Sequence, residues 1–402
     1  MSKLKVSAIH DPDNDNEAIT VDTSGNVSVS SNLKVNTIQD TTGNDALTID
    51  SSGNVTASQG FVPSTQLGHR NLIINGDMRV AQRGTSTTGV QGTDGYYACD
   101  RWRTQTDQGT WTVSQSTDAP DGFQYSQKIQ CTSTGGASGN ADEVCFRYYL
   151  EGQDVQHLAY GTSDAKKLTL SFWVKTNQTG TYTVMFQSQN SGAGFPRLSK
   201  TFTVNSADTW EYKTLSFIGD TTNTMPTDNT IGLALFVYFG AASTFTSGTQ
   251  NTTSWHSTNA DSVNSDIPGL GGSTSDYAQI TGVQLEVGSV ATPFEHRSYG
   301  EELARCQRYY YSSGTVGGNI ATHAGSNGWS CHFNFPVSMR TTPTVATSNT
   351  QSYSGSSWVN WTNSNGSDIT SLGFQFDVSG GFSSAFGNAY LFKGSYIADA
   401  EL

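Results

Sequence analysis

The chain has 402 residues, of which 35% are apolar, 11% are aromatic and only 14% are charged. The 34 acidic and 21 basic side chains give a formal net charge of −13, so phosphate backbones and anionic membrane surfaces are poor partners. The aromatic content is too high for a disordered chain, and no apolar run is long enough to span a membrane. We therefore expect a soluble, rigid protein, rich in Gly, Ser, Thr and Asn.

The cysteines are widely spaced and form neither a Cys-x-x-Cys motif nor a cluster with histidine. Residues 1–5 lack the apolar core of an export signal, so a disulfide framework is not expected. We predict free thiols that pack as small hydrophobic side chains: Cys99, Cys131, Cys145, Cys306 and Cys331.

Residues 1–58 contain two copies of one unit. The segment Ala18–Val27 matches Ala46–Val55, and one copy carries a one-residue insertion before the match. Apolar and polar residues alternate within each copy, and a Ser-Gly-Asn turn separates the alternating runs. This pattern predicts a short β-meander in each copy.

The two predicted meanders contain few large apolar side chains. At about 25 cal/mol per Å² of buried apolar surface, they cannot comfortably offset an ordering entropy of about 1.5 kcal/mol per residue. The apolar faces of the meanders are therefore expected to meet other copies of the chain. We predict that residues 1–58 form an oligomerisation stalk.

Residues 59–70 lose the alternation and are predicted to be a linker, and an all-β stretch follows over residues 71–298. One strong strand candidate, Leu168–Val174, is expected to have two apolar faces, as in a sandwich core. Turn signals separate the candidates at the spacing of a β-sandwich. No helical pattern alternates with the strands, so the predicted fold class is all-β.

A single short helix is predicted within the junction 299–314. Ser298 is a suitable N-cap, and Glu301 and Glu302 lie in the first turn, where the helix dipole favours negative charge. The helix is expected to bury one apolar stripe: Leu303, Cys306 and Tyr310. Strands resume after the junction, and residues 315–402 are predicted to form a second, smaller β-sandwich.

Several segments resemble proteins of bacteriophage tails. Asn71–Gly84, followed by Asp100–Trp102, looks like the opening of a jelly-roll domain of tail fibres, and Gln284–Tyr299 matches the end of that domain. The segments Glu301–Tyr310 and Phe335–Val345 are also typical of phage tail proteins. The resemblance implies a virion protein assembled in the bacterial host cytoplasm and used in host attachment. It also implies a homo-oligomer, usually a trimer, whose N-terminus joins other tail proteins.

The jelly-roll domain is similar in turn to carbohydrate-binding modules, which often hold a structural Ca²⁺ between the first strand and an acidic residue of the last strand. Asn75 and Asp77 match the first half of that site. Gln279 and Gly282 stand in the last strand where an acidic residue is expected. We therefore predict no cofactor, with Asn75 and Asp77 as the candidate ligands if Ca²⁺ is bound.

Sugar binding needs aromatic rings that stack on sugar C–H faces, with amide or carboxylate groups beside them. Two loop-like clusters have this composition and supply the candidate glycan contacts: Tyr353, Trp358, Asn360 and Trp361 in one, and Trp255 and His256 in the other. At least one of Trp358 and Trp361 is expected in the core, because they would lie on opposite faces of a strand. Strong strand patterns also predict three core tryptophans: Trp102, Trp173 and Trp210.

These observations predict a phage tail fibre protein that attaches to host-surface glycan through multivalent, non-enzymatic binding. No Gly-x-Ser-x-Gly motif opens a helix, and the histidines show no metal-ligand spacing. The chain also lacks the long β-helix on which depolymerase tailspikes usually place paired carboxylates. Two alternatives stay open: a purely structural appendage or spacer without a receptor site, and a polysaccharide-degrading tailspike.

Overall fold

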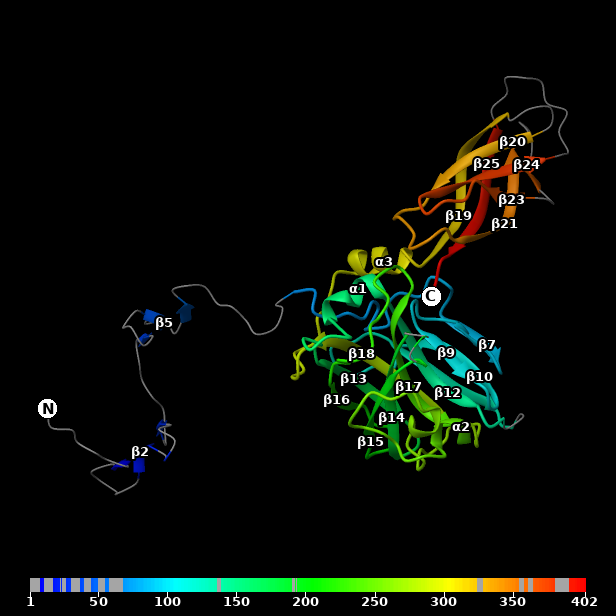
Figure 1. The fold of residues 1–402 in the computed structure, drawn as a ribbon. Coiled ribbons are helices and arrows are strands. Elements are labelled where there is room, and N and C mark those ends of the chain that lie inside the picture. Colours follow the sequence, from blue (N-terminus) through cyan, green and yellow to red (C-terminus); the bar gives the residue numbers. More distant parts are fainter. Residues whose placement is uncertain are drawn as a thin grey trace. The chain divides into compact units, whose positions relative to one another are not determined.

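The computed structural model of the chain describes residues 8–10, 17–21, 23, 27–29, 37–39, 45–49, 55–57, 68–135, 139–189, 192, 194–323, 328–353, 358–360, 364–379 and 390–402. The chain divides into two compact units, Met1–Ser64 and Thr65–Leu402. Antiparallel sheets dominate both units, so the predicted all-β fold class is confirmed (Figure 1). Among the described residues, no helix has the length and apolar character needed to cross a membrane.

The first unit contains two small antiparallel sheets with equivalent pairing. Their strands are β1 (Ala8–His10), β2 (Glu17–Val21) and β3 (Val27–Val29) in one sheet, and β4 (Thr37–Gln39), β5 (Asp45–Ile49) and β6 (Val55–Ala57) in the other. Ile19 pairs with Val29 in the first sheet, and Leu47 pairs with Ala57 at the matching place in the second. The repeated sequence therefore folds into two repeated meanders, as predicted.

Two six-stranded antiparallel sheets form the β-sandwich of the second unit. The sheet that we name the β13 sheet has the order β16 (Glu211–Phe217), β13 (Leu168–Thr176), β18 (Tyr277–Val287), β11 (Ser126–Ser133), β10 (Thr110–Ser116) and β7 (Ser86–Val90). The β17 sheet has the order β15 (Arg197–Val204), β14 (Gly180–Ser188), β17 (Ile231–Ala241), β12 (Glu143–Glu151), β9 (Arg103–Thr106) and β8 (Asp94–Tyr96). Two short helices, α1 (Gly152–Val155) and α2 (Ser243–Thr246), lie in the connections.

The core lies between the two sheets because each central strand turns alternate side chains inward. On β13, Leu170, Phe172 and Val174 are buried in the core. Aromatic rings meet in the core at edge-to-face angles, as Phe172 and Phe202 do with ring centroids 5.2 Å apart. All five cysteines are free and buried, which confirms the prediction that they pack as thiols.

The C-terminal strands form a seven-stranded sheet that begins directly after the junction helix. Its order is β22 (Trp358–Asn360), β21 (Thr344–Tyr353), β25 (Tyr390–Asp399), β19 (Tyr310–His323), β20 (Gly328–Asn334), β24 (Gly373–Ser379) and β23 (Ser364–Ser367). Its strands share a small aromatic core, in which the rings of Phe333, Phe374 and Tyr396 contact one another.

The junction helix is α3 (Tyr299–Gln307), and its predicted start is confirmed, since the Ser298 hydroxyl accepts the N–H of Glu301. The predicted apolar stripe is only partly correct. Cys306 is buried, but the other buried helix residue is Glu302, and Tyr310 already belongs to β19. The buried carboxylate of Glu302 forms an ion pair with Arg297 and accepts the backbone N–H of Asn75.

A buried polar joint connects the sandwich to the C-terminal strands. The Arg101 guanidinium is 1% exposed, pairs with Glu401 and lies 3.5 Å from the ring centroid of Tyr309. Arg83 lies over Tyr310 and also pairs with Glu401. Charged groups thus hold this joint together where an apolar contact would ordinarily be expected.

Candidate functional site

An open groove of about 880 Å³ lies on the outer face of the β13 sheet. Strands β13, β16 and β18 provide its floor, and two loops, 121–123 and 289–296, provide its rim. Its lining is mostly apolar and contains five rings: Phe123, Trp173, Tyr212, Phe294 and His296. A concave, aromatic surface with a few polar groups is the usual form of a ligand site.

Trp173 and Tyr212 are directly opposite each other on neighbouring strands. Their ring centroids are 5.4 Å apart, and the ring planes are tilted by 51°. Tyr212 is 46% exposed, so its ring is available to a ligand. Strand alternation explains the placement, because Phe172 points into the core and Trp173 therefore points outward.

Loops bring the other three rings into the groove. Phe123 follows β10, and its ring centroid lies 5.1 Å from that of Phe294 and 5.4 Å from that of His296. Phe294 and His296 follow β18, and their centroids are 4.9 Å apart. These three rings pack on one another and form one wall of the groove.

Gly282 allows the loop wall and the sheet to approach each other. It has φ +60° in β18, next to a register shift between β13 and β18. A Cβ atom at this position would lie 2.7 Å from Phe123 Cζ and 3.1 Å from Trp173 Cδ1. Only glycine combines this backbone conformation with such close ring contacts.

We expect Gly282→Ala to lower the free energy of unfolding by about 1–3 kcal/mol, because an alanine is strained at positive φ and its methyl group displaces Phe123. Gly272→Ala is the matched control, since no atom lies within 4 Å of a Cβ there. Denaturant unfolding of both variants checks this prediction. Equal stability of the two variants would contradict the proposed role of Gly282.

A smaller polar pocket of about 190 Å³ adjoins the aromatic groove, since Gly122, Phe123 and His296 line both. Its other lining residues are Asp77, Arg79, Gln124 and Arg297. The Nε of Arg79 donates to Oδ2 of Asp77 at 2.5 Å, and Nη2 donates to the carbonyl of Arg297 at 2.8 Å. The apolar groove and a pocket of opposite chemistry therefore lie next to each other and share these three lining residues.

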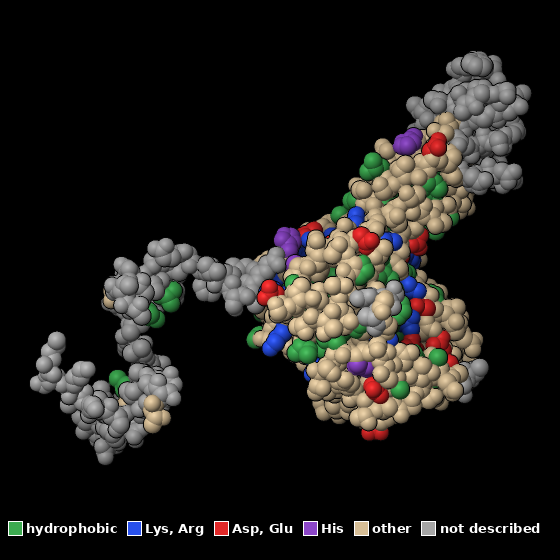
Figure 2. All heavy atoms as spheres, in the orientation of Figure 1, with side chains coloured by type: hydrophobic (Ala, Val, Ile, Leu, Met, Phe, Trp, Pro, Cys, Tyr) green, Lys and Arg blue, Asp and Glu red, His purple; other side chains and the backbone are tan. Residues whose placement is uncertain are grey.

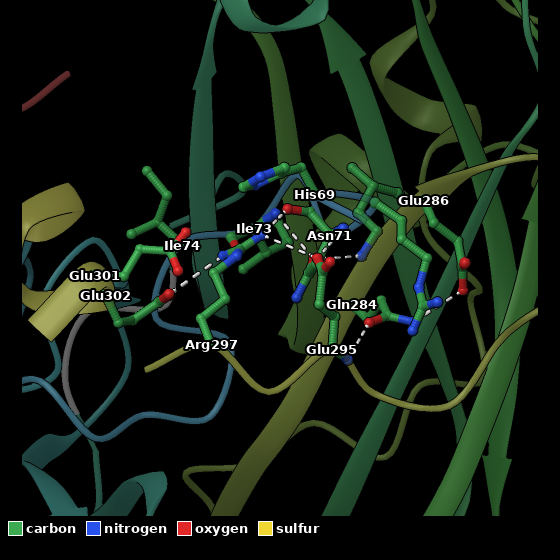
Figure 3. A network of polar contacts seen from close by, with 12 residues as sticks. His69, Asn71, Ile73, Ile74, Gln284, Glu286, Glu295, Arg297, Glu301 and Glu302 are labelled. Atoms are coloured by element: carbon green, nitrogen blue, oxygen red, sulfur yellow. Dashed lines mark hydrogen bonds and ion pairs between the residues drawn. The ribbon is translucent and has the colours of Figure 1, made fainter. Parts of the chain in front are cut away.

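A network of polar contacts fixes the loop that carries Phe294 and His296 (Figure 3). Arg297 donates to the carbonyls of Asn71 and Ile73 and forms ion pairs with Glu302 at 3.3 Å and with Glu295 at 3.5 Å. Burial favours the neutral form of Glu295, but the Asn71 N–H and the Arg297 charge hold the pKa of its carboxyl below the usual range.

Asn71 closes the same network from the first segment of the sandwich. Its side-chain oxygen accepts the N–H groups of Ile73 and Leu285, each at 3.0 Å, and its amide donates to the carbonyl of Val283 at 3.1 Å. The segments that resemble phage tail proteins thus tie the first and last parts of the sandwich together. The segment Gln284–Tyr299 also supplies Phe294 and His296 to the rim of the groove, whereas Trp173 and Tyr212 of the floor lie outside both segments.

The candidate Ca²⁺ ligands do not fit a metal site. The side-chain oxygen of Asn75 accepts the N–H of Val80, and its amide donates to the carbonyls of Val80 and Asp100. Asp77 is paired with Arg79, and the cations Arg79 and Arg297 line the pocket beside it. In the described part of the chain, no group of three or more His, Cys, Asp or Glu side chains has metal-binding geometry.

The structure places Trp255 and His256 beside the sandwich, in the connection after β17. The Trp255 indole donates to the carbonyl of Ile218 at 3.0 Å, and its ring packs against Tyr160. His256 pairs with Arg197 through the backbone, and burial lowers the pKa of its imidazole. Both residues therefore have packing roles, and a glycan contact for them stays a prediction.

The other predicted glycan contacts lie at the edge of the C-terminal sheet. Tyr353 ends β21, and Trp358 and Asn360 bound β22, whose Trp358 pairs with Tyr353. The side chains of these three residues, and Trp361 altogether, lie outside the described residues. This cluster stays a prediction.

The core prediction is correct for Trp102, which is fully buried, and wrong for Trp173 and Trp210. Trp173 lies on the outer face of β13, and Trp210 donates its indole N–H to Asp118 at 3.0 Å outside the core. The face of β13 opposite Phe172 carries Thr169, Ser171 and Trp173, so Trp173 is its single apolar residue and the expectation of two apolar faces is wrong. The sequence signal for this placement is strand alternation: if Phe172 faces the core, the next residue, Trp173, faces outward.

No family model matches the chain, and no curated protein matches it. Among solved structures, the chain is similar to the enzymatically active domain of tailspike protein 4 of bacteriophage CBA120, with 13% identity and a TM-score of 0.29; the match covers 54% of this chain and 21% of that one. It is also similar to the CBM22-2 xylan-binding domain of Paenibacillus barcinonensis Xyn10C, with 13% identity, a TM-score of 0.26, and coverage of 47% and 92%. A third similar structure is TmCBM61 in complex with β-1,4-galactotriose, with 10% identity, a TM-score of 0.27, and coverage of 55% and 99%.

Proposed function

We propose that the protein binds glycan through the aromatic groove of the β13 sheet. The observation that carries this proposal is the group of five rings that line one open groove, with a polar pocket next to it. Ring faces pack on the C–H faces of sugars, and polar groups beside them fix the hydroxyls. On the face shown in Figure 2, charged side chains are scattered among uncharged ones, and only 14% of the residues are charged, which favours recognition by stacking over recognition by charge.

The wider role that we propose is non-enzymatic host attachment by a phage tail fibre, with the meanders of residues 1–58 joining copies of the chain into an oligomer. A single shallow sugar site with a Kd near 1 mM contributes only about −4 kcal/mol. Several linked sites can raise the avidity about 10²- to 10⁴-fold without any new contact. Weak sites repeated on one particle are therefore sufficient for firm attachment.

The test is Trp173→Ala on a glycan array of bacterial surface and plant cell-wall oligosaccharides. We expect the wild-type chain to bind a subset of these glycans and the variant to lose at least tenfold in affinity, about 1.4 kcal/mol, because the stacking platform is gone. Phe195→Ala is the control, since Phe195 is an exposed aromatic residue next to β15 of the other sheet.

Equal binding by Trp173→Ala and the wild-type chain would contradict the proposed site. A wild-type chain that binds no glycan would support a purely structural spacer. Release of new reducing ends from a bound polysaccharide would contradict the non-enzymatic role and favour a degrading tailspike.

A further inference from the structure

The polar pocket beside the aromatic groove has the dimensions of a site for one sugar unit. Pockets that hold a whole ligand commonly measure about 300–1,000 Å³. The groove, at about 880 Å³, lies in that range, whereas the pocket, at about 190 Å³, lies below it. The pocket is also the more enclosed of the two hollows. An oligosaccharide in the groove would thus lie next to a smaller and less open space.

Asp77 and Arg79 present unused polar atoms in this pocket. Arg79 uses Nε for Asp77 and Nη2 for the Arg297 carbonyl, and Asp77 uses Oδ2 for Arg79. Among the described residues, Nη1 of Arg79, Oδ1 of Asp77 and the amide of Gln124 have no hydrogen-bond partner. The pocket therefore offers a donor, an acceptor and an amide that can act as both.

This combination matches sugar hydroxyls, because a hydroxyl group donates one hydrogen bond and accepts others. The Asp77 and Arg79 side chains are only 9% and 22% exposed, so their positions are fixed before a ligand arrives. The Arg297 side chain is 6% exposed and is held by two backbone carbonyls and two carboxylates. It forms part of the pocket lining and is not free to swing away.

Charge favours a neutral sugar over an acidic one. Asp77 lies in the pocket, Arg79 is already neutralised by it, and Arg297 is already paired with Glu302 and Glu295. The net charge of −13 adds long-range repulsion against anionic glycans. An acidic sugar could thus bind only by breaking one of these ion pairs of the protein or by approaching the carboxylate of Asp77.

We infer that the polar pocket binds the terminal sugar of a neutral glycan chain, so that the protein recognises chain ends. This inference rests on the proposed function, since the groove must first hold the sugars that lead to the terminal unit. The donor and acceptor pair, Arg79 and Asp77, selects the terminal sugar by the positions of its hydroxyls, and the rings of the groove hold the preceding units with less selectivity.

The test uses an array in which neutral oligosaccharides share one internal chain and differ only in the terminal sugar, with acid-terminated members included. We expect the wild-type chain to prefer one neutral terminus at least tenfold. Asp77→Asn and Gln124→Ala are each expected to reduce that preference several-fold while binding to the shared internal chain persists. Gln124 is exposed, so its variant tests the pocket without a risk to folding.

Asp266→Asn is the control for the loss of a carboxylate, because Asp266 is exposed and lies outside both hollows. Wild-type binding that ignores the terminal sugar, or that prefers acidic termini, would overturn the inference while leaving the groove intact. Unchanged preference in both Asp77→Asn and Gln124→Ala would also overturn it. If Trp173→Ala abolishes binding and the wild-type chain shows no preference among terminal sugars, the proposed groove is correct and the inference about the pocket is wrong.

Discussion

Arg297→Met is expected to lower the free energy of unfolding of the sandwich by about 3–5 kcal/mol, because it leaves the buried carboxylate of Glu302 without a counter-charge. The side chains of Arg297 and Glu302 are 6% and 4% exposed, so water cannot replace the lost partner. The carbonyls of Asn71 and Ile73 lose their guanidinium donors in the same variant. Denaturant unfolding, followed by circular dichroism, measures the effect.

Arg305→Met is the matched control for this prediction. Arg305 pairs with Glu301 at 2.9 Å on the same junction helix, but both side chains are at least one-third exposed. Exposed pairs of this kind contribute about 0–1 kcal/mol. Addition of Glu302→Gln to Arg297→Met is expected to recover part of the loss, since it removes the unpaired charge. Equal stability changes in Arg297→Met and Arg305→Met would contradict the structural role assigned to the network.

The second large effect that we predict is a dependence of stability on pH through Asp100. Burial, opposed by the charge of Arg83 and hydrogen bonds from Gln82, raises the pKa of Asp100 to about 6. An unfolded aspartate has a pKa of about 3.9, so the folded chain binds the proton more tightly than the unfolded chain does. The stability from this group is therefore fully present below about pH 4 and is lost as pH rises through 6.

The size of this effect is about 3 kcal/mol, from a pKa difference of about two units at 1.36 kcal/mol each. Asp100→Asn should remove it, so the difference in unfolding free energy between the variant and the wild-type chain should change between pH 4 and pH 7. The variant also loses a hydrogen bond. The Gln82 side-chain amide donates to Oδ2 of Asp100, and an asparagine NH2 group at that place cannot accept it. That loss is independent of pH in this range. A constant difference between the two proteins would contradict the raised pKa.

Much of the fold could be predicted from the sequence because local patterns dictate it. The alternation in residues 1–58, with its Ser-Gly-Asn turns, is sufficient for the meanders, and both copies adopt equivalent pairing. Ser298 was a correct N-cap because a hydroxyl at that position satisfies a free N–H whatever surrounds it. Such signals act over a few residues and need no knowledge of distant parts of the chain.

The groove could not be predicted in the same way, because its rings come from separate strands and loops. Phe123 and Phe294 are far apart in the sequence, and nothing near either residue indicates that their rings meet. In the sequence, Gly282 stands where an acidic metal ligand is expected, but only the structure shows that a side chain there would collide with Phe123 and Trp173. The carboxylate of Asp77 makes it a candidate cation ligand in the sequence, and its ion pair with Arg79 becomes visible only in the folded structure.

Fluorine NMR of fluorotryptophan-labelled protein, titrated with the neutral oligosaccharide bound most tightly on the array, tests the proposed groove most directly. The chain has 8 tryptophans, and single Trp→Phe variants assign their signals. We predict that the Trp173 signal shifts on binding while the signals of the buried Trp102 and Trp111 stay in place. A shift of Trp255 or Trp358 with Trp173 unmoved would contradict the site on the β13 sheet.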